Sequence, residues 1–190
     1  MELKLRRIEP RELRNLYRRM KRDFPPSERA PYFAIRRGML SGFFEGFFLS
    51  RAADTPGYAV CTPLHDRGFA LVNYLAVEPD ARNSGLGSRL MLLLEANYPA
   101  LSMMLEVENP DYAGDDGKEA LMRRRILFYE RAGYHIIEDV RYRLFGVEML
   151  LMTNYGAAVE DTAALMRAFY LPSLRNERLM RFVEVTAAKD

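Results

Sequence analysis

The chain has 190 residues, of which 49% are hydrophobic and 28% charged, and its formal net charge is +2. This size and composition predict a globular domain with a substantial core, and the near balance of charge argues against a nucleic-acid-binding protein. No apolar run approaches the length of a membrane span, no signal peptide is evident and Cys61 is the only cysteine, so we expect a cytoplasmic protein without an intrachain disulfide.

The N-terminal third of the chain is expected to form strands and two helices. Its first residues alternate charged and apolar side chains, which is typical of a strand. Pro10 suits the first turn of a helix, and apolar residues recur after it at helical spacing. The expected elements are a strand over residues 2–8, a helix from Pro10 with Leu13, Leu16, Tyr17 and Met20 on its apolar face, a helix over 31–40 ending at Gly42, strands over 43–51 and 57–62, and a turn at 54–56.

The most informative stretch of the chain is a glycine-bearing turn between an expected strand, residues 69–77, and an apolar helix. The turn reads Arg82-Asn83-Ser84-Gly85-Leu86-Gly87. Glycines at such a turn leave backbone N–H groups uncovered, and the helix N-terminus adds a positive partial charge, which predicts a site for a phosphorylated ligand. A dinucleotide-binding fingerprint would need a third glycine where Leu90 stands, and a P-loop would need a lysine after the second glycine. A turn without a ligand is the alternative.

A second pattern follows an expected strand over residues 101–108. Leu121, Phe128 and Ala132 share one helical stripe, and Met122, Ile126 and Tyr129 lie beside it. Gly133 stands where the end of a helix favours a residue with positive φ. By itself this pattern indicates only an amphipathic helix with a buried tyrosine.

The remainder of the chain is expected to add strands and one further helix. We expect strands over residues 134–140 and 141–152, a helix over 159–169 and a strand over 180–186. Residues 1–152 would then form the main domain, and residues 153–190 a C-terminal helix and tail packed on the same domain.

Together the two patterns resemble motifs of the GNAT superfamily of acyl-CoA N-acyltransferases. Arg82, Gly85 and Gly87 match the family pattern Gln/Arg-x-x-Gly-x-Gly/Ala, and residues 128–134 match Phe/Leu-Tyr-Glu-x-x-Gly-Phe/Tyr. The order of the expected elements over residues 1–152 is also that of the family. The resemblance implies an α/β (α+β) fold: a mixed, mostly antiparallel sheet with helices on both faces and a central pair of strands, 69–77 and 101–108, that splay apart.

The resemblance further implies an acetyl-CoA-dependent N-acetyltransferase that acts on a primary amine of a small molecule or peptide. In the family the loop amides bind the pyrophosphate of coenzyme A, and the acyl-pantetheine arm pairs with the preceding strand. Where many members carry an asparagine this chain has Met122, and the neighbouring arginines are possible substitutes. The residues expected to bind the cofactor are Leu75, Ala76, Val77, Arg82, Asn83, Ser84, Gly85, Leu86, Gly87, Ser88, Arg124 and Arg125.

The catalytic groups are expected on the helix that ends at Gly133 and on the strand before it, residues 101–108. Tyr129 occupies the position of the family's general-acid tyrosine, and a phenol is well matched to a departing thiolate. The general base is open, because Glu78, at the end of its strand, is more often solvated than catalytic. Glu106 and Glu108 point to one face of their strand and are candidates for holding a cationic amine and accepting its proton. Alternatively, they face solvent or bind the arginines of the following helix.

Other functions are less well supported by the residues. Cys61 and His65 do not indicate a thiol nucleophile, because Pro63 interrupts the segment and no third group orients the histidine. His65 and His135 cannot form a conventional metal site with one distant cysteine. We expect no metal, nucleic acid or membrane partner, and a monomer or homodimer that binds acetyl-CoA and an amine. A catalytically silent acyl-CoA-binding regulatory module is the alternative function.

Overall fold

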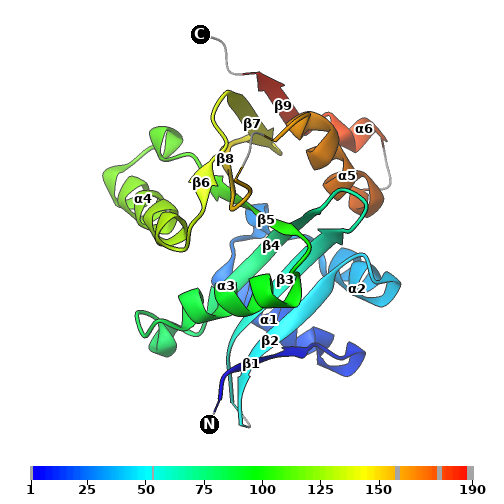
Figure 1. Ribbon diagram of the computed structural model, residues 1–190, viewed down its shortest axis with the longest axis vertical. Coiled ribbons are helices and arrows are strands. Elements are labelled where there is room, and N and C mark those ends of the chain that lie inside the picture. The colour runs from blue at the N-terminus through cyan, green and yellow to red at the C-terminus, as the bar shows by residue number, and fades with distance from the viewer. Residues whose placement is uncertain (1, 53, 157–158, 175–176, 188–190) are drawn as a thin grey trace. The chain divides into compact units, whose positions relative to one another are not determined.

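A computed structural model describes residues 2–52, 54–156, 159–174 and 177–187, and its elements are labelled in Figure 1. The chain divides into two compact units, Met1–Pro63 with Val72–Pro99, and Leu64–Leu71 with Ala100–Asp190. Residues 157–158, 175–176 and 188–190 of the expected C-terminal segment lie outside the described residues. None of the described helices is long and apolar enough to cross a membrane.

The described strands form a nine-stranded sheet in the order β1-β2-β3-β4-β5-β8-β7-β9, and β6 pairs with β8. Strand β4, Phe69–Val77, belongs to both units, because its first three residues lie in the second unit and the others in the first. Strand β2 pairs with β3, and β5 with β8, in antiparallel orientation. The pairings of β7 with β8 and with β9 are also antiparallel.

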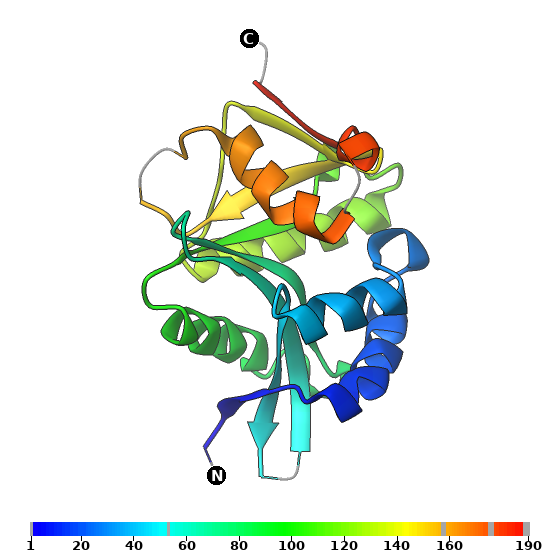
Figure 2. The same cartoon turned by 90° about the vertical axis from the view of Figure 1, so that its right-hand side faces the viewer.

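In the first unit, helices cover both faces of the strands. Helices α1, Leu13–Asp23, and α2, Tyr32–Ser41, lie on one side of β2, Glu45–Arg51, and β3, Asp54–Leu64, while α3, Leu86–Asn97, lies on the other (Figure 2). Strand β1, Lys4–Arg7, pairs with β2. The apolar stripe of α1 packs with α2 and the strands in one buried cluster of Ile8, Leu13, Leu16, Met20, Ile35, Phe44, Phe48, Tyr58 and Val60.

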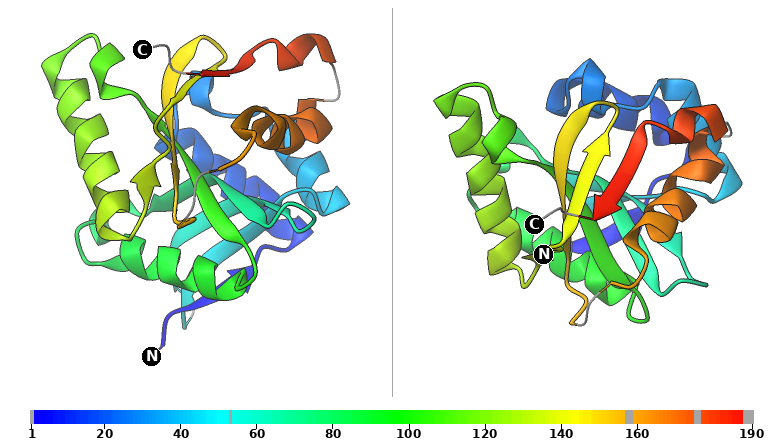
Figure 3. Two further views of the ribbon diagram at one scale, coloured as in Figure 1. Left: turned by 45° about the horizontal axis from the view of Figure 1, so that its top comes forward. Right: turned by 90° about the horizontal axis from the view of Figure 1, so that it is seen from above.

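The second unit has a similar layered arrangement. Helix α4, Asp116–Arg131, and helix α5, Thr162–Leu174, lie on opposite sides of its strands (Figure 3). The strands are β5, Ser102–Glu108, β6, His135–Ile136, β7, Val140–Leu144, β8, Val147–Thr153, and β9, Val183–Ala187, with the short helix α6, Glu177–Met180, before β9. Helix α5 packs on them through a cluster of Leu71, Met104, Tyr142, Leu151, Leu165, Met166 and Phe169.

This mixed, mostly antiparallel sheet with helices on both faces confirms the predicted fold class. Strand β4 has the predicted bounds, and α2 ends at Gly42, whose φ of 77° is the left-handed conformation that glycine adopts without strain. Gly133 likewise has a φ of 89° just after α4.

The predicted turn at residues 54–56 is wrong, because β3 already begins at Asp54. The chain turns earlier, where Ala52 has a φ of 54° and the β2–β3 register shifts between Leu49 and Arg51. Proline is common in turns, but it is also tolerated near the start of a strand, where Pro56 lies.

Residues 134–152 form three strands rather than the predicted two. A two-residue loop of Phe145 and Gly146, with φ values of 47° and 86°, joins β7 to β8. Positive φ at both loop positions suits the twist of a hairpin but is rare for phenylalanine, so the sequence carried little sign of this turn. The expected apolar stripe of α4 is also shifted, because Leu121 is 64% exposed whereas Ile126 is buried.

Candidate active site

The glycine loop of the first unit opens α3 in a conformation that depends on Gly85. Gly85 precedes the helix with a φ of 80°, and no atom lies within 4 Å of the position that a Cβ would take. The first intrahelical hydrogen bond runs from the N–H of Arg89 to the carbonyl of Gly85, at 3.0 Å. The N–H groups of Leu86, Gly87 and Ser88 therefore have no acceptor within the helix. Residues 82–85 are exposed, so these N–H groups are accessible at a helix start, a position at which anions are commonly bound.

Arg82, the first residue of the loop motif, is turned back towards the strand that precedes it. Its Nε donates to the carbonyl of Val77 at 3.2 Å, and its Nη2 lies 3.7 Å from the carboxylate of Asp23. Ser84 closes the loop by donating from Oγ to the carbonyl of Ala81 at 2.6 Å. The loop is thus tied to the end of β4 and to the end of α1.

A charged cluster that no sequence motif indicated surrounds this connection. The Asp23 side chain is only 3% exposed, and it accepts a hydrogen bond from the Tyr58 hydroxyl at 3.0 Å. Glu78 forms ion pairs with Arg19 at 2.8 Å and with Arg22 at 2.6 Å. Glu78 therefore bridges two guanidinium groups, a structural role that sequence spacing could not show because the arginines come from α1.

The last residues of β4, which were expected to meet the pantetheine arm, lie directly before this cluster. Leu75, Ala76 and Val77 are partly buried. A Cβ at Gly57 would lie 3.1 Å from the carbonyl oxygen of Ala76, so glycine allows β3 to approach this end of β4 closely.

Tyr129 lies on the last turns of α4 in the second unit. Its ring packs against Phe128 and Tyr134, with centroid distances of 5.0 Å and 6.3 Å. The N–H of Tyr134 donates to the Tyr129 carbonyl at 3.1 Å, which fixes the end of the helix. Burial raises the pKa of the Tyr129 phenol above its ordinary value, and the positive charge of Arg125 opposes that effect. The phenol is therefore protonated at neutral pH, as a proton donor must be.

The two carboxylates of β5 have different surroundings. Glu106 accepts hydrogen bonds from the hydroxyls of Tyr142 and Tyr170. The pKa of the Glu106 carboxyl lies above its ordinary value, because the effect of burial exceeds that of the hydrogen bonds from the two phenols, which lower it. Glu108 forms an ion pair with Arg125 at 3.1 Å. Thus Arg125, one of the expected cofactor ligands, contacts Glu108, while Arg124 is exposed on the same helix.

Cys61 is buried in β3. Burial raises the pKa of the Cys61 thiol far above its ordinary value, and nearby Glu45 adds to the effect. A thiol that stays protonated is a poor nucleophile. Among the described residues, no three His, Cys, Asp or Glu side chains are grouped as metal ligands would be.

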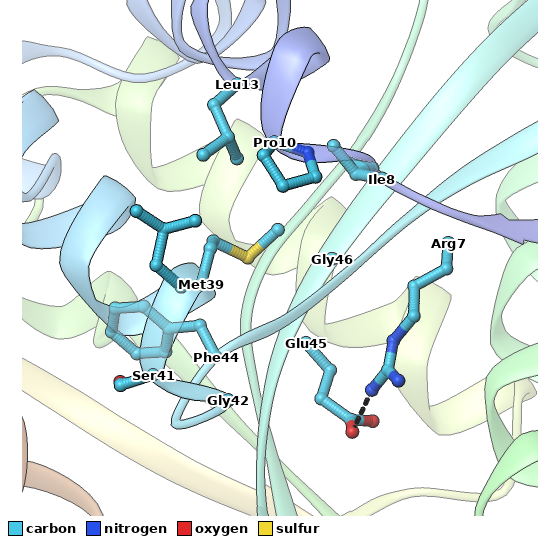
Figure 4. Close-up of a pocket in the computed structure, with 11 residues that line it drawn as sticks. Arg7, Ile8, Pro10, Leu13, Met39, Ser41, Gly42, Phe44, Glu45 and Gly46 are labelled. Carbon is cyan, nitrogen blue, oxygen red and sulfur yellow. Dashed lines mark hydrogen bonds and ion pairs between the residues drawn. The ribbon is translucent and has the colours of Figure 1, made fainter.

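A separate pocket of about 440 Å³ lies in the first unit between β1, the start of α1, the end of α2 and the start of β2. Figure 4 shows the ion pair of Arg7 with Glu45 at one side and the apolar side chains of Leu13, Met39 and Phe44 at the other. None of the site residues predicted from the sequence lines it.

Comparison with known proteins connects the loop and α4 to one family. Residues 45–136 match the model of the GNAT acetyltransferase domain, a segment that runs from β2 to β6 and includes the glycine loop and α4. The chain therefore contains an acetyltransferase domain of the GNAT superfamily, as its two motifs predicted. No curated protein shows a significant sequence match to the chain.

Solved structures of the same family share the fold. A GNAT-family acetyltransferase from Bacteroides thetaiotaomicron has a TM-score of 0.70 at 22% identity, over 88% of this chain and 96% of that one. The ribosomal-protein-S18-alanine N-acetyltransferase of Escherichia coli has a TM-score of 0.58 at 17% identity, over 85% and 98% of the two chains. An aminoglycoside 6′-N-acetyltransferase complexed with coenzyme A has a TM-score of 0.61 at 15% identity, over 83% and 99%.

Proposed function

We propose that this protein transfers the acetyl group of acetyl-CoA to a primary amine of a small molecule or peptide. The observation that carries the proposal is the accessible start of α3, where three N–H groups lack an acceptor within the helix and Gly85 leaves the backbone open. A pyrophosphate is the kind of ligand that such a helix start binds. The segment that matches the GNAT family includes this loop, which gives the phosphorylated ligand its proposed identity as coenzyme A.

The cofactor is proposed to bind through backbone groups more than through side chains. Residues 83–88 would hold the pyrophosphate, and the backbone of Leu75, Ala76 and Val77 would pair with the pantetheine arm. Arg82 supports this loop by its contacts with Val77 and Asp23. Arg124 and Arg125 are proposed to attract the phosphate groups.

The proposed reaction forms one bond and breaks one bond. The neutral amine attacks the thioester carbonyl, a carbon–nitrogen bond forms, and the carbon–sulfur bond breaks as coenzyme A leaves. An ammonium acceptor must first lose a proton, which a carboxylate or water accepts. The nitrogen loses a second proton after attack, and the thiolate gains one, so the overall products are the N-acetyl amine, coenzyme A and one proton.

Tyr129 is proposed to protonate the departing thiolate. Its phenol is protonated at neutral pH because burial raises its pKa, and its proton can be restored from the nitrogen that has attacked. An oxyanion forms on the thioester carbonyl during attack, and the backbone N–H groups of Leu75 or Val77 are proposed to stabilise it.

The acceptor is proposed to be a cationic amine held near Glu106 and Glu108. A carboxylate between two phenols can accept hydrogen bonds from an ammonium group and take up its proton. The fact that Glu106 comes from β5, inside the segment that matches the family, supports this role.

One observation favours the alternative of a silent acyl-CoA-binding module. Glu106 already accepts hydrogen bonds from two tyrosines, and Glu108 is paired with Arg125. Carboxylates with these partners are satisfied without an amine ligand.

The two functions are separated by measuring binding and turnover together. Calorimetry with acetyl-CoA and coenzyme A tests binding, and thiol release from acetyl-CoA is followed with a panel of polyamines, aminoglycosides and peptides with free N-termini. Binding with amine-dependent thiol release that is lost in Tyr129→Phe supports the transferase. Binding without turnover on any amine supports the silent module, and absence of binding overturns both.

A further inference from the structure

Glu106 is held by side chains from two different elements of the second unit. The hydroxyl of Tyr170, on α5, lies 2.8 Å from one carboxylate oxygen and 2.7 Å from the other. The hydroxyl of Tyr142, on β7, donates to the first of these oxygens. Three elements that are distant in sequence, β5, β7 and α5, therefore meet at one carboxylate.

The surroundings of this carboxylate are apolar apart from the two phenols. Tyr142 is 1% exposed and belongs to the same buried cluster as Met104, Leu151, Met166 and Phe169. Among the described residues, the titratable groups that face Glu106 are Tyr142 from β7 and Tyr170 from α5. A charge in such surroundings needs hydrogen-bond donors, and both phenols supply them.

The neighbouring carboxylate provides a contrast. Glu108 lies two residues further along β5, but its partner is the guanidinium of Arg125 on α4, which carries a full positive charge. Glu106 has neutral donors only. Burial favours the protonated form of Glu106 and the two phenol donors oppose it, so its charge depends on these hydroxyls, whereas the charge of Glu108 is already paired with Arg125.

We infer that Tyr170 and Tyr142 are positioning residues for Glu106, and that α5 thereby supplies part of the recognition of a cationic amine. The inference rests on the proposed transferase function. It assigns a role to the C-terminal segment, whose sequence resembles no motif of the family. Tyr170 spans both carboxylate oxygens and so fixes the rotation of the carboxylate plane, while Tyr142 supports one oxygen from the sheet side.

The arrangement has a direct consequence for proton transfer. Phenol donors favour the charged carboxylate, so removal of one hydroxyl makes protonation of Glu106 easier and raises its pKa. A base with a higher pKa is protonated over a wider range of pH, and the acidic limb of kcat/KM moves to higher pH. The amine substrate loses affinity at the same time, because the carboxylate is less often charged.

The test replaces Tyr170 with phenylalanine, which keeps the ring and removes the hydroxyl. Two readouts are needed: the pH dependence of kcat/KM for an accepted amine, and the pH titration of the Glu106 carboxyl by NMR on protein labelled with 13C at the glutamate carboxyl. Glu106→Gln identifies the signal. Tyr155→Phe is the matched control, because Tyr155 lies in the same unit, packs on Phe69 and is 38% exposed.

In Tyr170→Phe we expect the Glu106 titration and the acidic limb of kcat/KM to move upward by about one pH unit. The KM of the amine should change more than the KM of acetyl-CoA. Tyr142→Phe should move both in the same direction and provides a second variant if Tyr170→Phe is poorly folded. Tyr155→Phe should move neither. An unchanged Glu106 titration in both tyrosine variants overturns the inference. A shifted titration in a protein that acetylates no amine overturns the proposed function but leaves the positioning of Glu106 intact.

Discussion

The guanidinium of Arg82 lies 3.7 Å from the carboxylate of Asp23, so the first residue of the glycine loop is joined to the last residue of α1. Asp23 is nearly buried and also accepts a hydrogen bond from Tyr58, whereas Arg82 is 53% exposed. The buried Asp23 carboxylate therefore fixes the position of the exposed Arg82 guanidinium. This contact makes the geometry of the loop depend on a helix about sixty residues earlier in the chain.

Asp23→Asn should weaken the binding of coenzyme A as well as the fold. The asparagine amide lacks the charge that holds Arg22 and Arg82, so the free energy of unfolding should fall by about 1–3 kcal/mol. The Kd for coenzyme A should rise several-fold, because the loop is held less firmly. Urea unfolding and calorimetry measure the two effects. Glu119→Gln, which breaks the exposed ion pair with Arg123 on α4, is the control and should change neither. Wild-type affinity in folded Asp23→Asn would show that the contact does not support the loop.

Gly87→Glu should abolish tight binding of coenzyme A. Gly87 is the second residue of α3, and a carboxylate there would cover the helix N–H groups and repel the pyrophosphate, so Kd should rise at least about tenfold. Gly117 is the second residue of α4, which makes Gly117→Glu a matched control at another helix start. Equal affinities of Gly87→Glu and wild type for coenzyme A in calorimetry would remove the cofactor from this loop.

Tyr129→Phe should retain the affinity for acetyl-CoA and lower kcat by about 10²- to 10⁴-fold, the usual contribution of one acid–base group. Its ring contacts with Phe128 and Tyr134 do not involve the hydroxyl, so the variant should fold normally. Steady-state kinetics with an accepted amine and calorimetry with acetyl-CoA test this together. If kcat is unchanged, Tyr129 serves only in packing.

The stability of the first unit should depend on pH through Glu12. The hydrogen bond from Arg6 lowers the pKa of the Glu12 carboxyl to about 2, well below its ordinary range. A lowered pKa in the folded state adds stability above the unfolded pKa, and this stability is lost as pH falls through the folded value. Because the pair is partly exposed, Glu12→Gln should cost only about 1 kcal/mol at neutral pH. Unfolding curves of wild type and variant should converge between about pH 5 and pH 2; a constant difference at all pH values would contradict this origin.

The sequence predicted local elements and the glycine loop well because their signals are local. The spacing of Leu13, Leu16 and Met20 defines the buried face of α1, and Gly85 marks the left-handed turn before α3. Both depend on residues only a few positions apart.

Contacts between distant elements could not be predicted in the same way. The partners of Glu106 come from β7 and α5, 36 and 64 residues away, and no periodicity relates them. The pairing of Glu78 with Arg19 and Arg22 was missed for the same reason. The Phe145–Gly146 hairpin was missed because its first residue is not one that usually adopts positive φ.

The division of β4 between the two units has a consequence for synthesis on the ribosome. The first unit is complete in sequence once Pro99 has been made, but the second combines Leu64–Leu71 with residues from Ala100 onward. Leu64–Leu71 are therefore translated before the residues that they contact in the second unit, while the rest of β4 can already pair. A nascent chain of this kind folds vectorially, with one half formed and an apolar segment that includes Phe69, Ala70 and Leu71 left without its final neighbours. Slower translation beyond residue 100 would lengthen the interval in which this apolar segment lacks its final neighbours.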